Sequence, residues 1–240
     1  MSRAINIVAE LSVYYWVFTA VSSIFSEFGV WPALISFTIH LVLKMLNNYR
    51  VPLLSITIRD ASGLIFDFVE WENSSALIKV RLSGEGELRL FISLCTLVFA
   101  GTLILALTGS SLKDLNYFKL LLLFTILSTS TLFYNANSAY IKAIGATIPI
   151  IPSVAYATLV NTAIWLIFGD SYLNTFSILI NFIAIVVGCD ILTIKWAILN
   201  NTKSLVIGGL GLRDAVILVP TTSYFILSLV VNAMKFAFSS

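Results

Sequence analysis

The sequence predicts an all-α polytopic membrane protein with about seven transmembrane helices and a small cytoplasmic β-rich insertion. Three observations support this fold class. Of the 240 residues, 59% are hydrophobic and only 11% are charged, whereas soluble domains are typically about 25% charged. The apolar residues form runs of roughly 20 residues, the length that crosses a lipid bilayer. The remaining charges gather between these runs and in one segment of alternating polarity, residues 51–89.

Seven apolar runs are long enough to be spans, at residues 6–26, 29–46, 90–108, 117–134, 144–168, 174–198 and 206–236. The polar stretch TGSSLKDLN separates the third run from the fourth, and the sixth follows the loop sequence FGDSYLN. Helix-breaking residues open the fifth and seventh runs, in GATIPIIPS and GGLG. We therefore expect both of these helices to start kinked or unwound.

Residues 51–89 differ from the rest of the chain because polar and apolar residues alternate there. The apolar positions with a period of two are Ile56 and Ile58, Phe66 and Phe68, and Ile78, Val80 and Leu82. The turn-like sequences DASG, ENSS and SGEGE separate them. This pattern predicts three or four short β-strands. About 40 residues make a marginal core, so we interpret the segment as an insertion in a single membrane domain, residues 1–240.

The distribution of basic residues predicts the orientation. With seven spans, most of the 14 Lys and Arg residues fall on the side of the N-terminus, and the exceptions are Lys113, Lys119 and Lys235. Cytoplasmic loops have an excess of Lys and Arg. We therefore expect a multi-pass protein of the cell membrane with a cytoplasmic N-terminus and a cytoplasmic insertion. Its expected partner is the lipid bilayer and not a nucleic acid, and the oligomeric state stays open.

The sequence predicts no metal or cofactor site. Cys95 and Cys189 lie in apolar runs without metal-ligand spacing, and His40 is the single histidine. We interpret the cysteines as small buried apolar residues. GGLG is not followed by Lys and then Ser or Thr, so a phosphate-binding loop is not indicated.

Two aspartates in neighbouring apolar segments are the candidate functional residues. Asp190 lies late in the sixth run and Asp214 early in the seventh, within GCDILTIKWAILNNTKSLVIGGLGLRDAV. A charge inside a membrane costs a few kcal/mol or more and usually faces a bundle interior or a wet cavity. The short loop NNTKS makes the two segments antiparallel neighbours. If the seventh helix begins near Val206, the aspartates lie at comparable depth and can face each other.

A pair of carboxyl groups can hydrolyse a peptide bond. Neighbouring carboxyls cannot both ionise easily, so they share one proton. The ionised group then activates water, and the protonated group polarises the peptide carbonyl and later protonates the leaving nitrogen. Gly208, Gly209 and Gly211 permit the backbone to unwind beside a substrate, so we expect them to be substrate-binding residues.

Other interpretations of the same residues stay open. Asp190 can form an ion pair with Lys195 near a helix end, and Asp214 can be the cap of a helix after a glycine turn. The two aspartates can bind a cation or a proton in a small-solute carrier, since interrupted helices frame transport sites. A non-catalytic membrane assembly protein requires nothing of the aspartates.

Long segments of the chain resemble a family of prokaryotic membrane proteins. FSEFGVWPALISFTIHLVLKMLNNYRVPL, GATIPIIPS and GCDILTIK followed by VIGGLGLRDAVILV resemble the domain-of-unknown-function 1614 family over most of the chain. This resemblance implies a polytopic membrane fold. The family has no established activity to transfer.

A second resemblance covers residues 174–236. An aspartate in one helix and a glycine-x-glycine-aspartate element in the next are similar to the intramembrane aspartyl proteases, which include presenilin, signal peptide peptidase and the preflagellin peptidases. This resemblance implies that Asp190 and Asp214 are the catalytic aspartates, that Gly211 is the leading glycine, and that the substrate is a membrane-embedded peptide. The chain departs from the motif at Arg213, where the family has glycine, and no Pro-Ala-Leu element follows.

Overall fold

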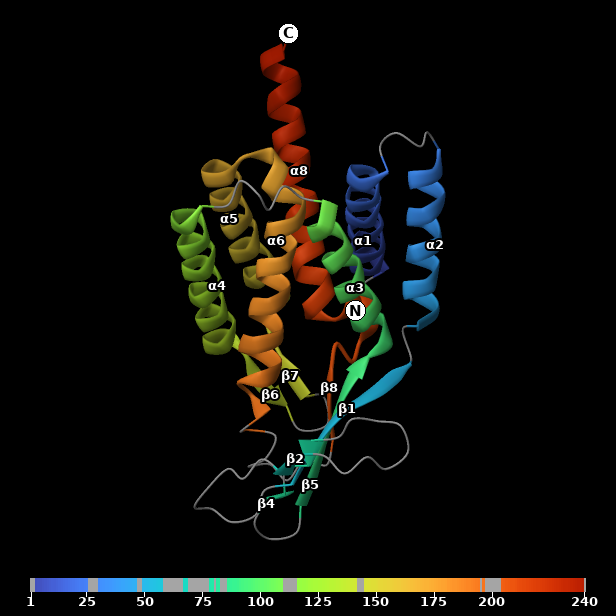
Figure 1. Ribbon diagram of the computed structural model, residues 1–240, viewed down its shortest axis with the longest axis vertical. Coiled ribbons are helices and arrows are strands. Elements are labelled where there is room, and N and C mark those ends of the chain that lie inside the picture. Colours follow the sequence, from blue (N-terminus) through green and yellow to red (C-terminus); the bar gives the residue numbers. More distant parts are fainter. Residues whose placement is uncertain are drawn as a thin grey trace.

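A computed structural model describes residues 3–25, 30–46, 49–57, 67–68, 78–79, 81–82, 86–109, 116–141, 145–194, 196 and 204–239. The α-helices of these residues are α1 (Arg3–Ile24), α2 (Trp31–Met45), α3 (Leu94–Gly109), α4 (Tyr117–Asn137), α5 (Ile150–Phe168), α6 (Asp170–Ile185) and α8 (Ala215–Ser239). They form a bundle, and the strands gather at one of its ends (Figure 1). We call this end the strand end.

The apolar helices agree with the membrane fold that the sequence predicts. Four are long and apolar enough to cross a membrane, and they cover Tyr117–Asn137, Ile150–Phe168, Tyr172–Ile191 and Ala215–Phe238. Three shorter apolar helices cover Ile7–Ser22, Trp31–Met45 and Leu94–Ile104. Outward-facing apolar side chains are exposed along the bundle, among them Phe124, Leu159 and Leu166. Such side chains are favourable where the surrounding solvent is lipid.

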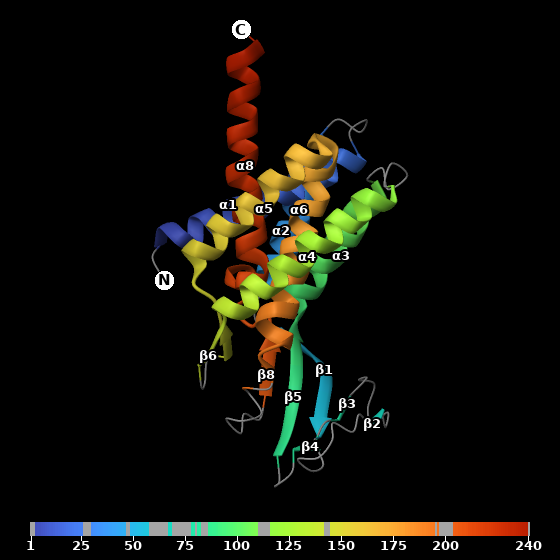
Figure 2. The same cartoon turned by 90° about the vertical axis from the view of Figure 1, so that its left-hand side faces the viewer.

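Helix α8 lies at the centre of the bundle. It packs against α1, α5 and α6, and α6 packs in turn against α4 and α5. The largest buried cluster joins side chains of α1, α3, α6 and α8, including Trp16, Phe99, Ile178 and Ile217. The C-terminal turns of α8 extend past the ends of the other helices, at the end opposite to the strands (Figures 1 and 2).

A chain of buried polar groups ties four helices together. The Tyr134 hydroxyl on α4 donates to Asn181 Oδ1 on α6 at 3.0 Å. The side-chain amide of Asn161 on α5 lies 2.8 Å from Asn181 Nδ2 and 3.0 Å from Ser223 Oγ on α8. All four side chains are fully buried. Polar groups in an apolar bundle hydrogen-bond across helices, so this network fixes how the four helices meet.

Four strands form the main sheet at the strand end. β1 (Arg50–Thr57) pairs antiparallel with β5 (Gly86–Ser93), and β4 (Arg81–Leu82) pairs with the start of β5. β8 (Ser204–Ile207) runs parallel to the end of β5, with Arg89 opposite Ser204 and Ile92 opposite Ile207. Two further pairs are β2 (Asp67–Phe68) with β3 (Ile78–Lys79), and β6 (Ala139–Ile141) with β7 (Gly145–Thr147). Most of segment 51–89, with Ile58, Phe66 and Val80, lies outside the described residues.

The predicted starts of the third and seventh helices were wrong. Residues 90–93 belong to β5, and α3 begins at Leu94. Residues 204–207 form β8, and α8 begins at Ala215. A run that is apolar on both faces has no periodicity to separate a strand from a helix. The fifth run has the predicted non-helical start, because Gly145–Thr147 form β7, with a φ of 101° at Gly145, and α5 begins only at Ile150.

Helix α6 continues into a π-helix over Val186–Ile191. The Leu192 N–H donates to the Val187 carbonyl, five residues back, at 2.9 Å. Gly188 makes room for this turn, because a Cβ atom there would lie 2.5 Å from the Thr131 carbonyl oxygen on α4. Single π-helical turns recur at functional sites. The predicted sixth helix, 174–198, thus begins earlier, at Asp170, and changes its winding where Asp190 lies.

Candidate functional site

Both predicted aspartates lie at the strand end. Asp190 is in the π-helical turn that follows α6, and Asp214 immediately precedes α8. The end of the α6 segment and the start of α8 lie at the same end of the bundle, so the fold brings the two aspartates to one region of the molecule. This position also places them beside the sheet, because β8 leads to Asp214 through the glycine turn (Figure 1).

The Asp190 carboxyl is buried without a complete set of partners. Asp190 is 7% exposed, and its Oδ2 atom has no hydrogen-bond partner within the described part of the chain. The Thr193 hydroxyl holds the backbone of this turn: it donates to the Cys189 carbonyl and lies 3.2 Å from the Asp190 carbonyl. Lys195, the alternative ion-pair partner, lies outside the described residues. Burying a carboxyl without a donor costs free energy, so this side chain is placed at a cost to stability.

Asp214 is held by the backbone at the start of α8. Its Oδ1 atom accepts from the Val216 N–H and its Oδ2 atom from the Leu210 N–H, both at 3.1 Å. Its carbonyl oxygen accepts from the Leu218 N–H at 2.8 Å. The carboxyl is thus a helix cap, as one interpretation of the sequence suggested. Asp214 lies before the first turn of α8, so the helix start near Val206, on which the expected equal depth of the two aspartates depended, is not found.

The glycine turn between β8 and Asp214 depends on Gly208. This residue has a φ of 68°, a left-handed conformation that favours glycine. A Cβ atom there would also lie 1.9 Å from Thr96 Oγ1. A Cβ atom on Gly209 would meet nothing closer than 3.4 Å, and Gly211 opens the 3-10 turn Gly211–Arg213. The turn therefore reverses the chain against α3 and delivers Asp214 to the bundle.

The start of α3 adds groups that sequence reasoning missed. Ser93 Oγ and Thr96 Oγ1 are buried and find no hydrogen-bond partner among the described residues. The sequence places them in an apolar span, where a lone hydroxyl gives no signal. Cys95 and Cys189 are buried free thiols, in agreement with their predicted role as apolar residues. No group of residues in the described ranges has the composition of a metal site.

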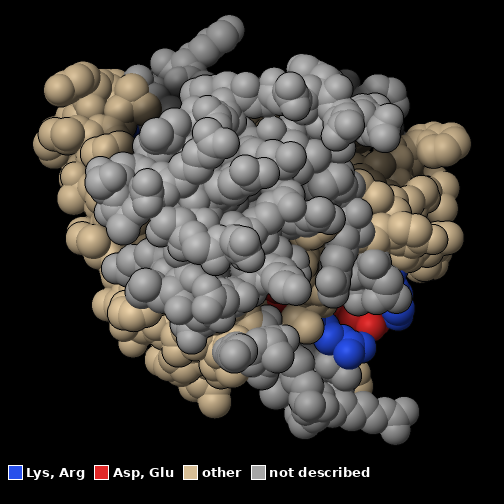
Figure 3. Space-filling view, turned by 90° about the horizontal axis from the view of Figure 1, so that it is seen from below, with Lys and Arg blue, Asp and Glu red and all other residues tan. Residues whose placement is uncertain are grey.

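A separate ion pair neutralises charge on neighbouring helices of this end. Glu10 on α1 accepts from Lys44 on α2 at 3.0 Å, and both side chains are partly exposed. His40 stacks edge to face on Tyr14, with ring centroids 5.7 Å apart. Viewed from the strand end, most of the visible described charges lie at one edge of the face, and a further acidic patch lies closer to its middle (Figure 3). Glu10 therefore has its own partner, unlike the Oδ2 atom of Asp190, which finds none in the described structure.

The two acids at the strand end differ in their surroundings. One carboxyl is buried and short of donors, and the other is oriented by two backbone N–H groups. Paired acids in different surroundings are the usual basis for separate acid and base roles. The interpretation depends on this geometry alone, since no protein-family model, no curated protein and no solved structure matches the chain.

Proposed function

We propose that the chain is an intramembrane aspartyl peptidase-like protein that hydrolyses a membrane-embedded peptide near the cytoplasmic face with Asp190 and Asp214. We further propose that it is a distant relative of the intramembrane aspartyl proteases and of the domain-of-unknown-function 1614 family. One observation supports this most: the buried carboxyl of Asp190, with an unpartnered oxygen in the described structure, lies at the same end of the bundle as the carboxyl of Asp214, which the backbone holds.

The surroundings of the two acids suggest separate roles. Two backbone N–H groups stabilise the ionised form of Asp214. Asp190 Oδ2 has no donor in the described structure, so the proton that the pair shares is better placed on Asp190. In this proposal Asp214 is the general base and Asp190 the general acid.

The reaction balances with one water molecule. Asp214 takes a proton from water as the water oxygen bonds to the peptide carbonyl carbon. Asp190 donates a hydrogen bond to the carbonyl oxygen and stabilises the negative charge that develops there. The tetrahedral intermediate then collapses, the C–N bond breaks, and the leaving nitrogen takes up a proton from the pair. The products are a carboxyl group and an amine, and the two acids together return to one shared proton.

β8 offers a place for an extended substrate. Among the described strands it pairs with β5 only, so one of its edges has no strand partner there. An extended peptide can add to such an edge through main-chain hydrogen bonds. Gly208, Gly209 and Gly211 follow directly and have no side chains to block the approach to Asp214. We propose that these glycines contact the substrate backbone.

The proposal includes the seven-span topology with a cytoplasmic N-terminus. Successive helices of the bundle alternate in direction (Figures 1 and 2). Lys119 in α4 and Lys235 in α8 both lie toward the end of the bundle away from the strands.

Single cysteines in place of the exposed residues Tyr117 and Met45 test this topology. A membrane-impermeant thiol reagent added to intact cells should label the Cys introduced at 117 and not the one at 45, and the reverse pattern would contradict it.

The test of catalysis compares new peptide termini in cell membranes. Cells that express the natural chain should accumulate cleaved membrane peptides that are absent with Asp190→Asn or Asp214→Asn at equal expression. Asp170→Asn is the matched control, because Asp170 is an exposed aspartate of the same helix. Cleavage that survives both site variants contradicts the proposal and leaves the non-catalytic assembly protein.

A carrier is the second candidate, favoured by the π-helical interruption at Asp190 and the buried polar chain from Tyr134 to Ser223. Interrupted helices and buried polar groups also mark transport sites. Purified chain in liposomes distinguishes the two functions. A carrier takes up protons or cations in an Asp190-dependent manner and cleaves no peptide.

A further inference from the structure

A cavity of about 240 Å³ lies between α1, α6 and α8, at the end of the bundle away from the strands. Asp214 precedes the first residue of α8, whereas Lys235 of the cavity lies near its last turn. The cavity is therefore separate from the two aspartates of the proposed peptidase site. Nothing in the proposed hydrolysis uses it.

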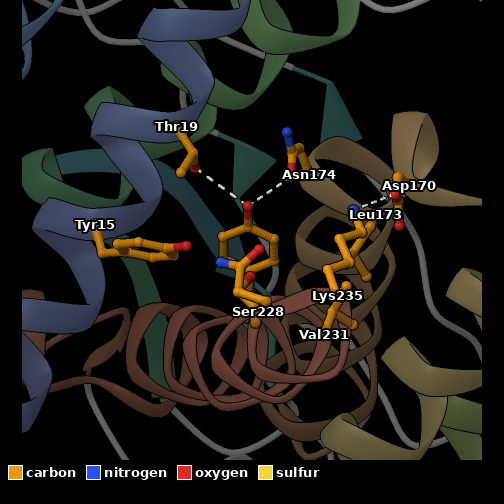
Figure 4. A pocket seen from close by; sticks show the side chains of 10 residues that line it. Tyr15, Thr19, Asp170, Leu173, Asn174, Ser228, Val231 and Lys235 are labelled. Carbon is orange, nitrogen blue, oxygen red and sulfur yellow. Dashed lines mark hydrogen bonds and ion pairs between the residues drawn. The ribbon is translucent and has the colours of Figure 1, made fainter. Parts of the chain in front are cut away.

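One wall of the cavity is a preformed layer of neutral polar groups. The buried Tyr224 hydroxyl lies 2.5 Å from Asn174 Oδ1 and 3.3 Å from Thr19 Oγ1 (Figure 4). Asn174 is held from behind, because Trp16 Nε1 donates to its carbonyl oxygen at 3.2 Å. Tyr15 adds its ring and hydroxyl from α1. These groups offer both donors and acceptors at fixed positions.

The cavity also has one cation and one anion side by side. Lys235 Nζ lies 2.5 Å from Asp170 Oδ2, and Trp165 Nε1 donates to Asp170 Oδ1 at 2.5 Å. The hydrogen bonds from Lys235 and then Trp165 hold the pKa of Asp170 below its ordinary value. Both charged side chains are more than half exposed, at 58% for Lys235 and 53% for Asp170. Each charge is thus within reach of a solute.

We propose that this cavity binds a small zwitterion, in which an ammonium group and an anionic group lie a few bonds apart. A purely cationic ligand would pair with Asp170 and leave Lys235 without its partner, and a purely anionic ligand would do the reverse. A zwitterion gives both residues a new opposite charge. The neutral wall of Tyr224, Asn174 and Thr19 then accepts and donates the remaining hydrogen bonds. A free amino acid and a zwitterionic phospholipid headgroup share this chemistry.

The first experiment compares L-serine with its two single-charge fragments. The full chain is placed in phosphatidylglycerol nanodiscs, and its unfolding temperature is followed as each compound is added. L-serine should raise the unfolding temperature, because a ligand that binds the folded state stabilises it. Ethanolamine, which keeps the ammonium, and 3-hydroxypropanoate, which keeps the carboxylate, should each bind at least tenfold more weakly. Equal effects of all three compounds, or no effect of serine up to about 10 mM, would overturn the proposal.

Substitutions of two lysines test whether serine binds in this cavity. Lys235→Gln should weaken serine binding at least tenfold, whereas Lys44→Gln should leave it unchanged. Lys44 is the suitable control because it also forms an ion pair with an acidic residue, Glu10, and is 56% exposed. Asp170→Asn provides a second variant with the same expected loss. If Lys44→Gln weakens binding as much as Lys235→Gln, or if neither Lys235→Gln nor Asp170→Asn weakens it, the cavity is not the site.

The lipid composition separates the two sources of the zwitterion. In phosphatidylethanolamine nanodiscs, a headgroup that occupies the cavity should abolish the effect of serine. A free solute as the natural ligand predicts the same serine effect in both lipids. Both results support a zwitterion site, and neither depends on cleavage by Asp190 and Asp214. Failure of the peptidase proposal and failure of this one are therefore distinguishable.

Discussion

The two ends of α6 each have an aspartate, and the two side chains are in opposite surroundings. Asp170, the first residue of the helix, is half exposed and accepts from Lys235 and Trp165. Asp190, in the π-helical turn at the other end, is buried, and its Oδ2 atom lacks a partner in the described structure. The same residue type is thus satisfied at one end and left short of donors at the other.

The interactions of Asp170 stabilise the fold, whereas the burial of Asp190 lowers the stability of the fold. An exposed ion pair contributes at most about 1 kcal/mol, so the pairing of Asp170 changes the free energy of unfolding only slightly. A buried acceptor without a donor costs about 1–3 kcal/mol. Perturbed acids of this kind cluster at functional sites. The strand end is therefore where we place the chemistry, and the opposite end is where we place the binding of a solute.

The largest expected effect is on catalysis. Asp190→Asn should lower the rate of peptide cleavage by about 100- to 10,000-fold, because it removes a general acid. The same variant should unfold at the same or a higher temperature than the natural chain, since an amide is cheaper to bury than a carboxyl. Asp170→Asn should keep the cleavage rate. If Asp190→Asn and Asp170→Asn lose equal cleavage activity on the same membrane peptide, the proposed difference between the two ends of α6 is contradicted.

The next effect is on the turn that presents Asp214. Gly208→Ala should lower the free energy of unfolding by about 2–4 kcal/mol, because a left-handed conformation and a contact with Thr96 both oppose a methyl group. Gly209→Ala is the control and should change it by less than about 0.5 kcal/mol. Denaturation in detergent measures both. The account of the turn is contradicted if the two variants are equally stable.

Much of the bundle could be predicted from the sequence, because roughly 20 apolar residues in a row have one stable solution in lipid. The position of the Asp190 and Asp214 segments at one end of the bundle also followed, since a short connection joins them. The extended states of residues 90–93 and 204–207 did not follow, because they depend on the pairing of β5 with β8, strands that are far apart in the sequence.

Three further features also depend on contacts between residues that are far apart in the sequence. The π-helical turn at Asp190 depends on the approach of Gly188 to Thr131 on α4. The cavity joins Tyr15 near the start of the chain to Lys235 near its end. The pairing of Lys235 with Asp170 has no signature in spacing or composition. Such contacts arise only when the helices pack.

A smaller effect is expected for the buried polar chain between the two ends. Tyr134→Phe should lower the free energy of unfolding by about 1 kcal/mol, because Asn181 Oδ1 loses the hydroxyl that donates to it. Tyr117→Phe is the control, since Tyr117 is 82% exposed. Thermal unfolding of the two variants in the same detergent provides the comparison. A loss no larger at Tyr134 than at Tyr117 would show that the network does not hold the helices.

The smallest effect is a pH dependence at Asp170. The pKa of Asp170 is lowered in the folded chain, so its ion pair stabilises the fold above the unfolded pKa of about 4. This contribution is lost as the pH falls through the lowered folded pKa. The natural chain should therefore exceed Asp170→Asn in unfolding temperature at pH 7, by an amount that corresponds to at most about 1 kcal/mol. The difference should shrink as the pH falls below about 4 and through the lowered folded pKa of Asp170, and a difference that grows on acidification would contradict the assignment.

Binding of a transition-state mimic tests the central claim most directly. A hydroxyethylene peptide isostere with a photoreactive group places a hydroxyl where the tetrahedral intermediate forms, and such mimics bind more tightly than substrates. It should label the natural chain and Asp170→Asn equally. Asp190→Asn and Asp214→Asn should each reduce labelling by at least about 100-fold. Labelling that is unchanged in either of these two variants would contradict a shared role for Asp190 and Asp214.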